Sequence, residues 1–254
     1  MIGPTTRSLV LRSLGFLVVL EGILVPAILF WPNFRDNIDA LRGMAPLPML
    51  RDMVDALGEG GIAAYVLGQQ FFKGCNSLGV AAGILFAMGA VAGEAQRGTL
   101  EIWLSRPLSR KRQLTEKWVG GALAITLPVF ISSATIPWLI SFVDETMELG
   151  SLMVCSLHQS LFLVMIYSIT FLLSTMGRKP ILIAFVMLFF TTFEFAIYLV
   201  KTATHYSLFR LVDVPVFLAI YGKTSLDLEK TAILVASIAV CYVASLFIFE
   251  RRVP

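Results

Sequence analysis

Long apolar runs alternate with short polar stretches along most of the chain. Six of the runs are long enough, alone or with their flanks, to cross a membrane, because roughly 20 helical residues span a hydrocarbon core about 30 Å thick. The predicted spans are residues 15–31, 75–93, 118–142, 150–176, 181–200 and 230–249. The pattern therefore predicts an all-α polytopic membrane protein, with one transmembrane domain over residues 1–254 and both termini on the same side.

The segment before the first span is a separate prediction. Residues 1–14 place Arg7 and Arg12 among apolar positions, which favours a short amphipathic helix lying in the membrane surface. A signal peptide is the competing interpretation, because basic residues precede an apolar run. Glu21 inside that run, and the poor cleavage site Val25-Pro26-Ala27, argue against it.

Two longer connections are expected on the opposite side, over residues 32–73 and 201–229. Within the first, residues 62–72 fit either a surface helix or the outer start of the second span. The second contains an apolar stretch, residues 208–221, that charges and a proline interrupt, so we expect a re-entrant or surface helical hairpin there. The second span is rich in glycine and alanine, which predicts a central position with close helix contacts.

Composition agrees with a membrane protein. Of 254 residues, 57% are hydrophobic and only 15% are charged, whereas soluble domains carry about 25% charged residues. The charge is unevenly distributed: the side with the termini, residues 94–117 and the turn at Arg178 carries 12 Lys and Arg against four acids, and the other side eight against eleven. By the positive-inside rule the first side is cytoplasmic, and we expect a bacterial cytoplasmic (inner) membrane.

The sequence contains no residue pattern typical of a metal site or a redox-active cysteine pair. The three cysteines have no CxxC or Cys/His spacing, and two of them fall inside apolar runs. The two histidines are far apart. We therefore expect no metal site and no cofactor in this chain.

The most polar stretch between two spans is residues 93–118. Gly98-Thr99 can start a helix of about two turns, with Thr99 as its N-cap and Glu101 in its first turn. Pro107 ends that helix, and Ser109 can cap the next one, which continues into the third span. The short helix has an apolar surface formed by Leu100, Ile102, Trp103 and Leu104.

Two interpretations of this stretch are open from the residues alone. It is either an ordinary basic cytoplasmic loop, as polytopic proteins generally have, or a lever that fits the groove of a partner. One aromatic and three aliphatic side chains on such a loop need burial somewhere, which favours the second interpretation.

The loop resembles the one that follows the second helix of ABC-2 type (type V) ABC transporter permeases. The resemblance rests on Glu94, Arg97-Gly98-Thr99-Leu100-Glu101, Pro107 and Ser109-Arg110, followed by Lys117 at the start of a span. The six spans, the N-terminal surface helix and the broken segment before the last span are also similar to that family, so the resemblance covers nearly the whole chain.

The resemblance implies that this loop is a coupling helix docked on a separate ATPase subunit, and that two permease copies form the path, as a homodimer rather than a heterodimer. Five residues match the motif: Glu94, Gly98, Thr99, Glu101 and Pro107. Four more are contact candidates by position only: Arg97, Leu100, Trp103 and Leu104. The long connection 32–73 departs from the compact members, which leaves the substrate open and allows an extracytoplasmic accessory protein; no nucleic-acid partner is expected.

ATP hydrolysis is not expected in this chain. Gly222-Lys223-Thr224 is similar to the end of a P-loop, but that motif needs a glycine at position 217, which is Phe. No strand-loop-helix context surrounds it. ATP must therefore act through a partner.

Two acids inside the spans are candidates for a translocation path. Glu21 and Glu194 are costly in lipid, at about 2.5–3.5 kcal/mol for a charge at mid-membrane, so they are expected to face the protein interior or water. Each is either a group that lines the path or a structural acid at a helix interface.

Two further interpretations assign the chain to another functional class. One is an intramembrane enzyme, which would bring Glu21, His158 and Glu194 to one depth. The other is a membrane scaffold whose basic face binds anionic lipid.

Overall fold

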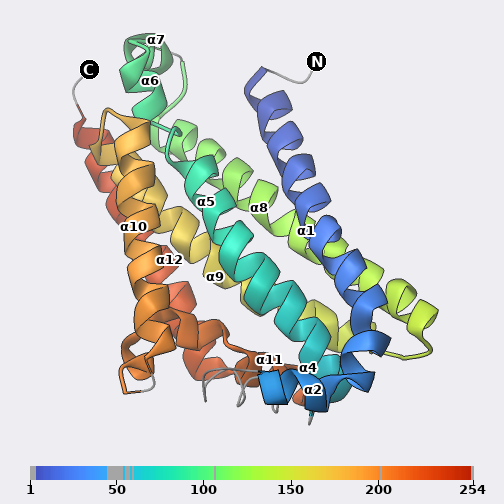
Figure 1. The fold of residues 1–254 in the computed structure, drawn as a ribbon. Helices are drawn as coiled ribbons and strands as arrows, with labels where there is room; N and C mark the ends of the chain where they lie inside the picture. The colour runs from blue at the N-terminus through green and yellow to red at the C-terminus, as the bar shows by residue number, and fades with distance from the viewer. Residues whose placement is uncertain are drawn as a thin grey trace.

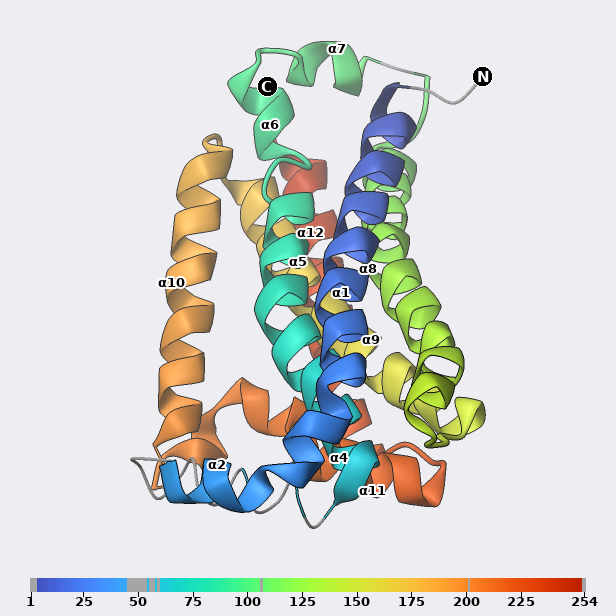
Figure 2. The same ribbon diagram turned by 45° about the vertical axis from the view of Figure 1, so that its right-hand side comes forward.

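The computed structural model of the chain describes residues 4–44, 54, 58, 60–105, 107–200 and 202–252. Every regular element in these residues is a helix. The longer helices stand side by side as one bundle (Figure 1). The first and last described residues lie at the same end of this bundle, as the two-sided sequence pattern predicts (Figures 1 and 2).

Five helices are long and apolar enough to cross a membrane. They are α1 (Pro4–Asp36), α8 (Arg110–Ile140), α9 (Leu149–Met176), α10 (Pro180–Leu199) and α12 (Leu228–Arg251). Each contains or closely matches one of the predicted spans, so the all-α polytopic prediction is confirmed.

A sixth helical column is built from three consecutive elements. These are α4 (Gly61–Leu67), the π-helical segment η1 (Gly68–Gly79) and α5 (Val80–Ala87), which follow one another without a break and pack against α1 and α9 (Figure 2). The predicted second span, 75–93, is therefore displaced: the column begins at Gly61 and ends at Ala87. Residues 62–72 form its outer start rather than a surface helix, because they are enclosed by protein, as the stacking of Phe71 on Phe217 at 4.8 Å shows.

The N-terminal region differs from the expectation of a separate surface helix over residues 1–14. The helix α1 is continuous from Pro4 to Asp36, so residues 4–14 are its first turns. Gly15 at the expected junction costs only about 1 kcal/mol in a helix, which is too little to break it. Pro32, expected to end the span, also lies inside α1, whose packing along α8 supports the helix beyond it.

The helix α9 is the centre of the bundle. It packs against α5, α8, α10, α11 and α12, and 67% of its most apolar stretch is buried, compared with 22% in α1 and 17% in α12. A Cβ atom on Gly121 of α8 would lie 2.2 Å from the Tyr167 hydroxyl of α9, so this crossing requires glycine. The outer helices α1, α10 and α12 therefore leave most of their apolar surface for lipid or for another chain.

Short helices cover the end of the bundle opposite the termini (Figure 1). They are α2 (Ile38–Met44), η3 (Thr204–Tyr206), η4 (Leu208–Val212) and α11 (Val214–Lys223). The side chain of Asp213 accepts the Val216 N–H at 3.2 Å and so caps α11. The hairpin expected within residues 201–229 thus corresponds to η4 and α11, placed at the end of the bundle.

Candidate functional site

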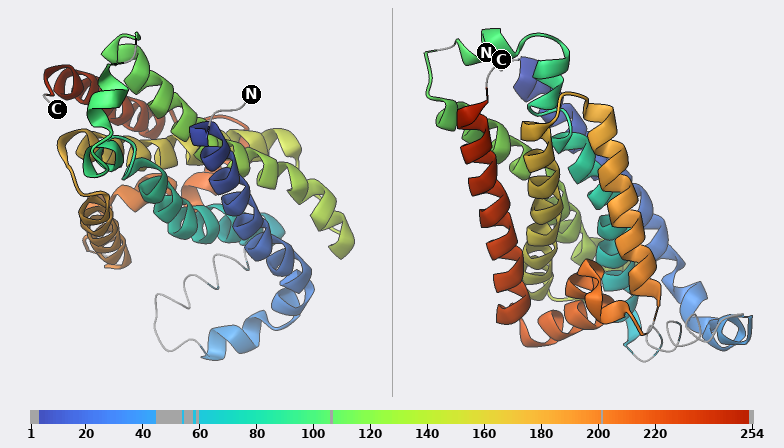
Figure 3. Two further views of the ribbon diagram at one scale, coloured as in Figure 1. Left: turned by 90° about the horizontal axis from the view of Figure 1, so that it is seen from above. Right: turned by 90° about the vertical axis from the view of Figure 1, so that its left-hand side faces the viewer.

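The polar loop projects from the end of the bundle where both termini lie (Figure 3). It contains α6 (Ala92–Gln96) and α7 (Leu100–Leu104), and it continues into α8. The start of α6 is fixed to the central helix, because the backbone N–H groups of Val91 and Ala92 both donate to Ser174 Oγ of α9 at 3.1 Å. The two short helices are therefore attached to the bundle at a defined point.

The turn between α6 and α7 depends on Gly98 and Thr99. Gly98 has φ +69°, a left-handed conformation that side chains other than glycine adopt only at a cost. The Thr99 hydroxyl does not cap α7, as the sequence suggested, but donates to Glu94 Oε2 at 2.5 Å. A carboxylate is the stronger acceptor, and its position one turn earlier draws the hydroxyl away from the helix N–H groups.

Glu94 is the centre of this turn. Besides Thr99, its carboxylate contacts Lys117 Nζ of α8 at 3.1 Å and Arg97 Nη2 at 3.2 Å. Lys117 also donates to the Ala90 carbonyl at 2.8 Å. Burial raises the pKa of Glu94, but the Thr99 hydrogen bond and the charge of Lys117 outweigh it and lower the pKa to about 2. The carboxylate thus stays ionised and ties the loop to α8.

The apolar face of α7 points inward. Trp103 is only 6% exposed; its ring lies 5.1 Å from that of Phe249 on α12, and the Lys117 ammonium lies 3.9 Å from its centroid. Leu100 is buried in the same core. The burial that these residues require is therefore supplied by the chain itself, and they hold α7 on the bundle.

Among the described residues of the loop the exposed surface is mainly polar, with two exposed large apolar side chains, Ile102 and the less exposed Leu108 at 37%. Arg97, Gly98, Glu101 and Pro107 are exposed, and so is Ile102, at 67%. Ile102 was part of the predicted apolar surface but was not among the predicted contact residues. Its exposure could have been predicted from the helical spacing, which places Ile102 on the side of α7 that faces away from Leu100 and Trp103. The side chain of Leu104 lies outside what the structure describes.

The predicted start of α8 is confirmed. Ser109 has an extended backbone, and its hydroxyl accepts the Arg112 N–H at 3.3 Å. The loop is therefore bounded by Ser174 contacts at its beginning and by a capped helix at its end.

The two intramembrane acids have separate partners. Glu21 of α1 accepts a hydrogen bond from Thr135 of α8 at 3.0 Å. Glu194 of α10 accepts the Leu208 N–H at 2.9 Å and thereby holds the start of η4. The column of α5 stands between α1 and α10, so the structure does not bring the two acids together (Figure 2).

His158 is not joined to either acid. Its Nε2 contacts the Leu211 carbonyl at 2.8 Å, and its neighbour Gln159 donates to Asn76 at 2.9 Å. No group of three or more His, Cys, Asp or Glu that could hold a metal ion occurs in the described parts of the chain. The arrangement that an intramembrane enzyme would require is therefore not found among these residues.

Comparison with known proteins agrees with this arrangement. A family model described as "ABC-2 family transporter protein" matches residues 44–252, which include the whole loop and all helices from α4 to α12. A search of curated proteins found no match for the chain. The matched range covers most of the sequence, and the helical bundle, the anchored loop and the common end of the termini are consistent with it. The chain belongs to the ABC-2 family of transporters and is a membrane permease component of that class.

Proposed function

We propose that this chain moves a substrate across a membrane with energy from a separate ATPase subunit that docks on residues 94–117. The observation that carries the proposal is the two-sided character of α7. Its inner side is fixed to the bundle through Trp103, and its outer side offers Ile102 and Glu101 to a partner. An exposed isoleucine between charged and polar neighbours is suited to a shallow protein groove.

The contacts behind α7 give the docked partner a mechanical route into the membrane. Force on Ile102 reaches α12 through the Trp103–Phe249 ring contact. It reaches α8 through the Lys117 ammonium, which touches both the Trp103 ring and the Glu94 carboxylate. A rigid link to two spans allows a movement of the ATPase to change how those spans pack.

The remaining parts of the proposal concern the assembly. The substrate path forms between two copies of the chain in a bacterial cytoplasmic membrane, with the loop and the termini on the cytoplasmic side. The largely unburied apolar faces of α1, α10 and α12 support contact with a second copy and with lipid. Residues 32–73 are the proposed place for an extracytoplasmic accessory protein.

Of the two acids, Glu21 is the stronger candidate for the substrate path. Its carboxylate is partly exposed between α1 and α8 and bonds a threonine hydroxyl. The carboxylate of Glu194 is used by the Leu208 N–H, so its exchange would first disturb η4.

Co-purification tests the proposal directly. The tagged chain is expressed in its native host and solubilised, and the retained proteins are identified by mass spectrometry and assayed for ATP hydrolysis. We expect a P-loop ATPase to be retained by the native chain, lost with Ile102→Asp, and kept with Tyr206→Asp, which introduces the same charged residue at an exposed position of the opposite end. Retention of the ATPase by Ile102→Asp, or absence of any ATPase from the native chain, would refute the proposed docking.

A further inference from the structure

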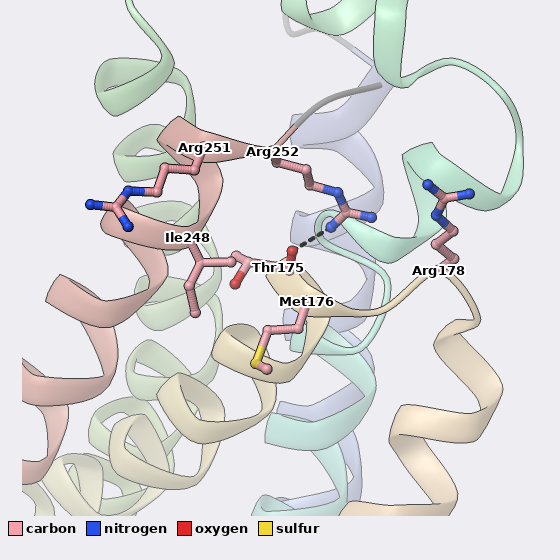
Figure 4. Close-up of a pocket in the computed structure, with 6 residues that line it drawn as sticks. All are labelled: Thr175, Met176, Arg178, Ile248, Arg251 and Arg252. Carbon is pink, nitrogen blue, oxygen red and sulfur yellow. Dashed lines mark hydrogen bonds between the residues drawn. The ribbon is translucent and has the colours of Figure 1, made fainter.

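A basic hollow lies where the ends of α9 and α12 meet. Its volume is about 400 Å³, and it is lined by Thr175, Met176, Arg178, Ile248, Arg251 and Arg252. Figure 4 shows Arg251 and Arg178 on either side of Arg252, with Met176 and Ile248 below them. The volume is within the range of pockets that hold small ligands.

Arg252 is held in place by the end of the central helix. Its guanidinium donates to the carbonyl oxygen of Thr175 and, at 2.7 Å, to that of Gly177. Arg178 lines the same hollow, and burial together with its nearby charge lowers the pKa of Arg252 (Figure 4). Holding these like charges together favours an anion between them.

The chain supplies no such anion in its described parts. Arg178 and Arg251 are exposed, and no carboxylate of the described residues lies within ion-pair distance of either. The acid closest in sequence, Glu250, is paired with Lys111 at 3.4 Å. The positive charge of the hollow is therefore available to a ligand.

An apolar stripe leads to the hollow. Val240, Val243 and Phe247 are exposed on α12 and share one helix face with Arg251, since they precede it by eleven, eight and four residues. Met176, at the end of α9, is 62% exposed. Apolar side chains thus lie on the membrane side of three guanidinium groups, as acyl chains lie beneath a phosphate.

We infer that this hollow binds the headgroup of an anionic phospholipid, with the phosphate held by Arg178, Arg251 and Arg252 and an acyl chain along the Val240–Phe247 stripe. The charge supplies the attraction, and the adjoining stripe distinguishes a lipid from a soluble anion. The inference concerns the permease alone and is independent of the docking of an ATPase.

Lipid titration of the purified full-length chain in detergent tests the inference. Thermophoresis with dihexanoyl phosphatidylglycerol is compared with dihexanoyl phosphatidylcholine and with inorganic phosphate. The variant R178Q/R251Q removes two charges from the hollow, and the control K111Q/R112Q removes two charges from the same end of the bundle outside it. At roughly 1 kcal/mol for each basic residue, R178Q/R251Q should weaken phosphatidylglycerol binding about 30-fold, and the control less than about threefold.

Three results would overturn the inference. Equal losses in R178Q/R251Q and in the control would assign the effect to general surface charge. Inorganic phosphate that binds as tightly as phosphatidylglycerol and displaces it would identify a soluble anion as the ligand. Phosphatidylglycerol binding that is unchanged in R178Q/R251Q would show that the hollow does not hold the lipid.

Discussion

The Glu94 contacts provide the sharpest test of how the loop is held. Glu94→Gln keeps the size of the side chain and one acceptor for Thr99 but removes the charge that faces Lys117 and Arg97. We expect α6 and α7 to open more often, because their link to α8 depends on that charge. The fold of the spans should not change.

The free energy that the loop loses in Glu94→Gln follows from the pKa of Glu94, which falls from 4.5 to about 2 in the folded protein. A shift of this size corresponds to about 3 kcal/mol between the charged and the neutral carboxyl group. The side chain is only 21% exposed, so solvent screens little of it. Since glutamine keeps one hydrogen bond, we expect a loss of about 2 kcal/mol, or a 30-fold increase in the open population.

Hydrogen exchange of peptides covering residues 93–104 measures this opening. Exchange should rise about 30-fold in Glu94→Gln and less than about twofold in the control Glu101→Gln, which removes an exposed carboxylate with no ion pair among the described residues. The reasoning is refuted if both variants exchange like the native chain, or if both exchange equally faster.

The same pKa fixes the pH dependence of the loop. A carboxyl group whose pKa is lowered by folding contributes its full stability above the unfolded value of 4.5 and loses it as the pH falls toward about 2. Protection of the loop, corrected for the intrinsic exchange rate, should therefore be constant between pH 7 and about 5 and decline below that range. In Glu94→Gln this decline should be absent.

Three further substitutions test the packing. Gly121→Ala places a methyl group 2.2 Å from the Tyr167 hydroxyl and should lower stability by about 1–3 kcal/mol in detergent melting, whereas Gly120→Ala, with its nearest atom at 3.5 Å, should be nearly neutral. Ser109→Ala removes the cap of α8 and should cost about 1 kcal/mol, seen as roughly fivefold faster exchange in its first turn. Trp103→Ala should release α7, at a cost of about 3 kcal/mol, and speed tryptic cleavage after Arg97 about 100-fold; unchanged cleavage would contradict the anchoring.

The spans were predictable wherever the apolar pattern was uninterrupted. The second column was misplaced because Gln69, Gln70 and Lys73 interrupt its apolar pattern before residue 75 and were taken as polar loop. Gln70 is nevertheless buried, and its amide donates to Ser132 at 3.0 Å; Asn76, inside the predicted span, is also buried and donates to the Val212 carbonyl at 3.1 Å. Burying an amide side chain costs little free energy when it is hydrogen-bonded to other segments of the chain. Those segments cannot be identified before the fold is known.

The position of the candidate site along the chain was predictable, but which side of α7 faces the bundle was not. The breaks at Gly98 and Pro107 and the cap at Ser109 are local signals, and they marked the ends of α7 and the start of α8. Which side of α7 faces a partner depends on Phe249, which follows Trp103 by 146 positions and meets it only in the folded bundle. The sequence showed that the apolar face needed burial and left its location open.

Lys117 explains why so small a helix can be held firmly. Its ammonium group contacts the Glu94 carboxylate, the Ala90 carbonyl and the face of the Trp103 ring, so one charge joins α8 to the end of the α5 column and to α7. The ring in turn touches α12. These contacts share an atom and therefore do not act independently, since loss of the Glu94 charge also leaves Lys117 freer to move away from Trp103. Beside the buried Leu100, the lysine–tryptophan pair thus links α7 to both α8 and α12, and a displacement of α7 must either move these spans or break that pair.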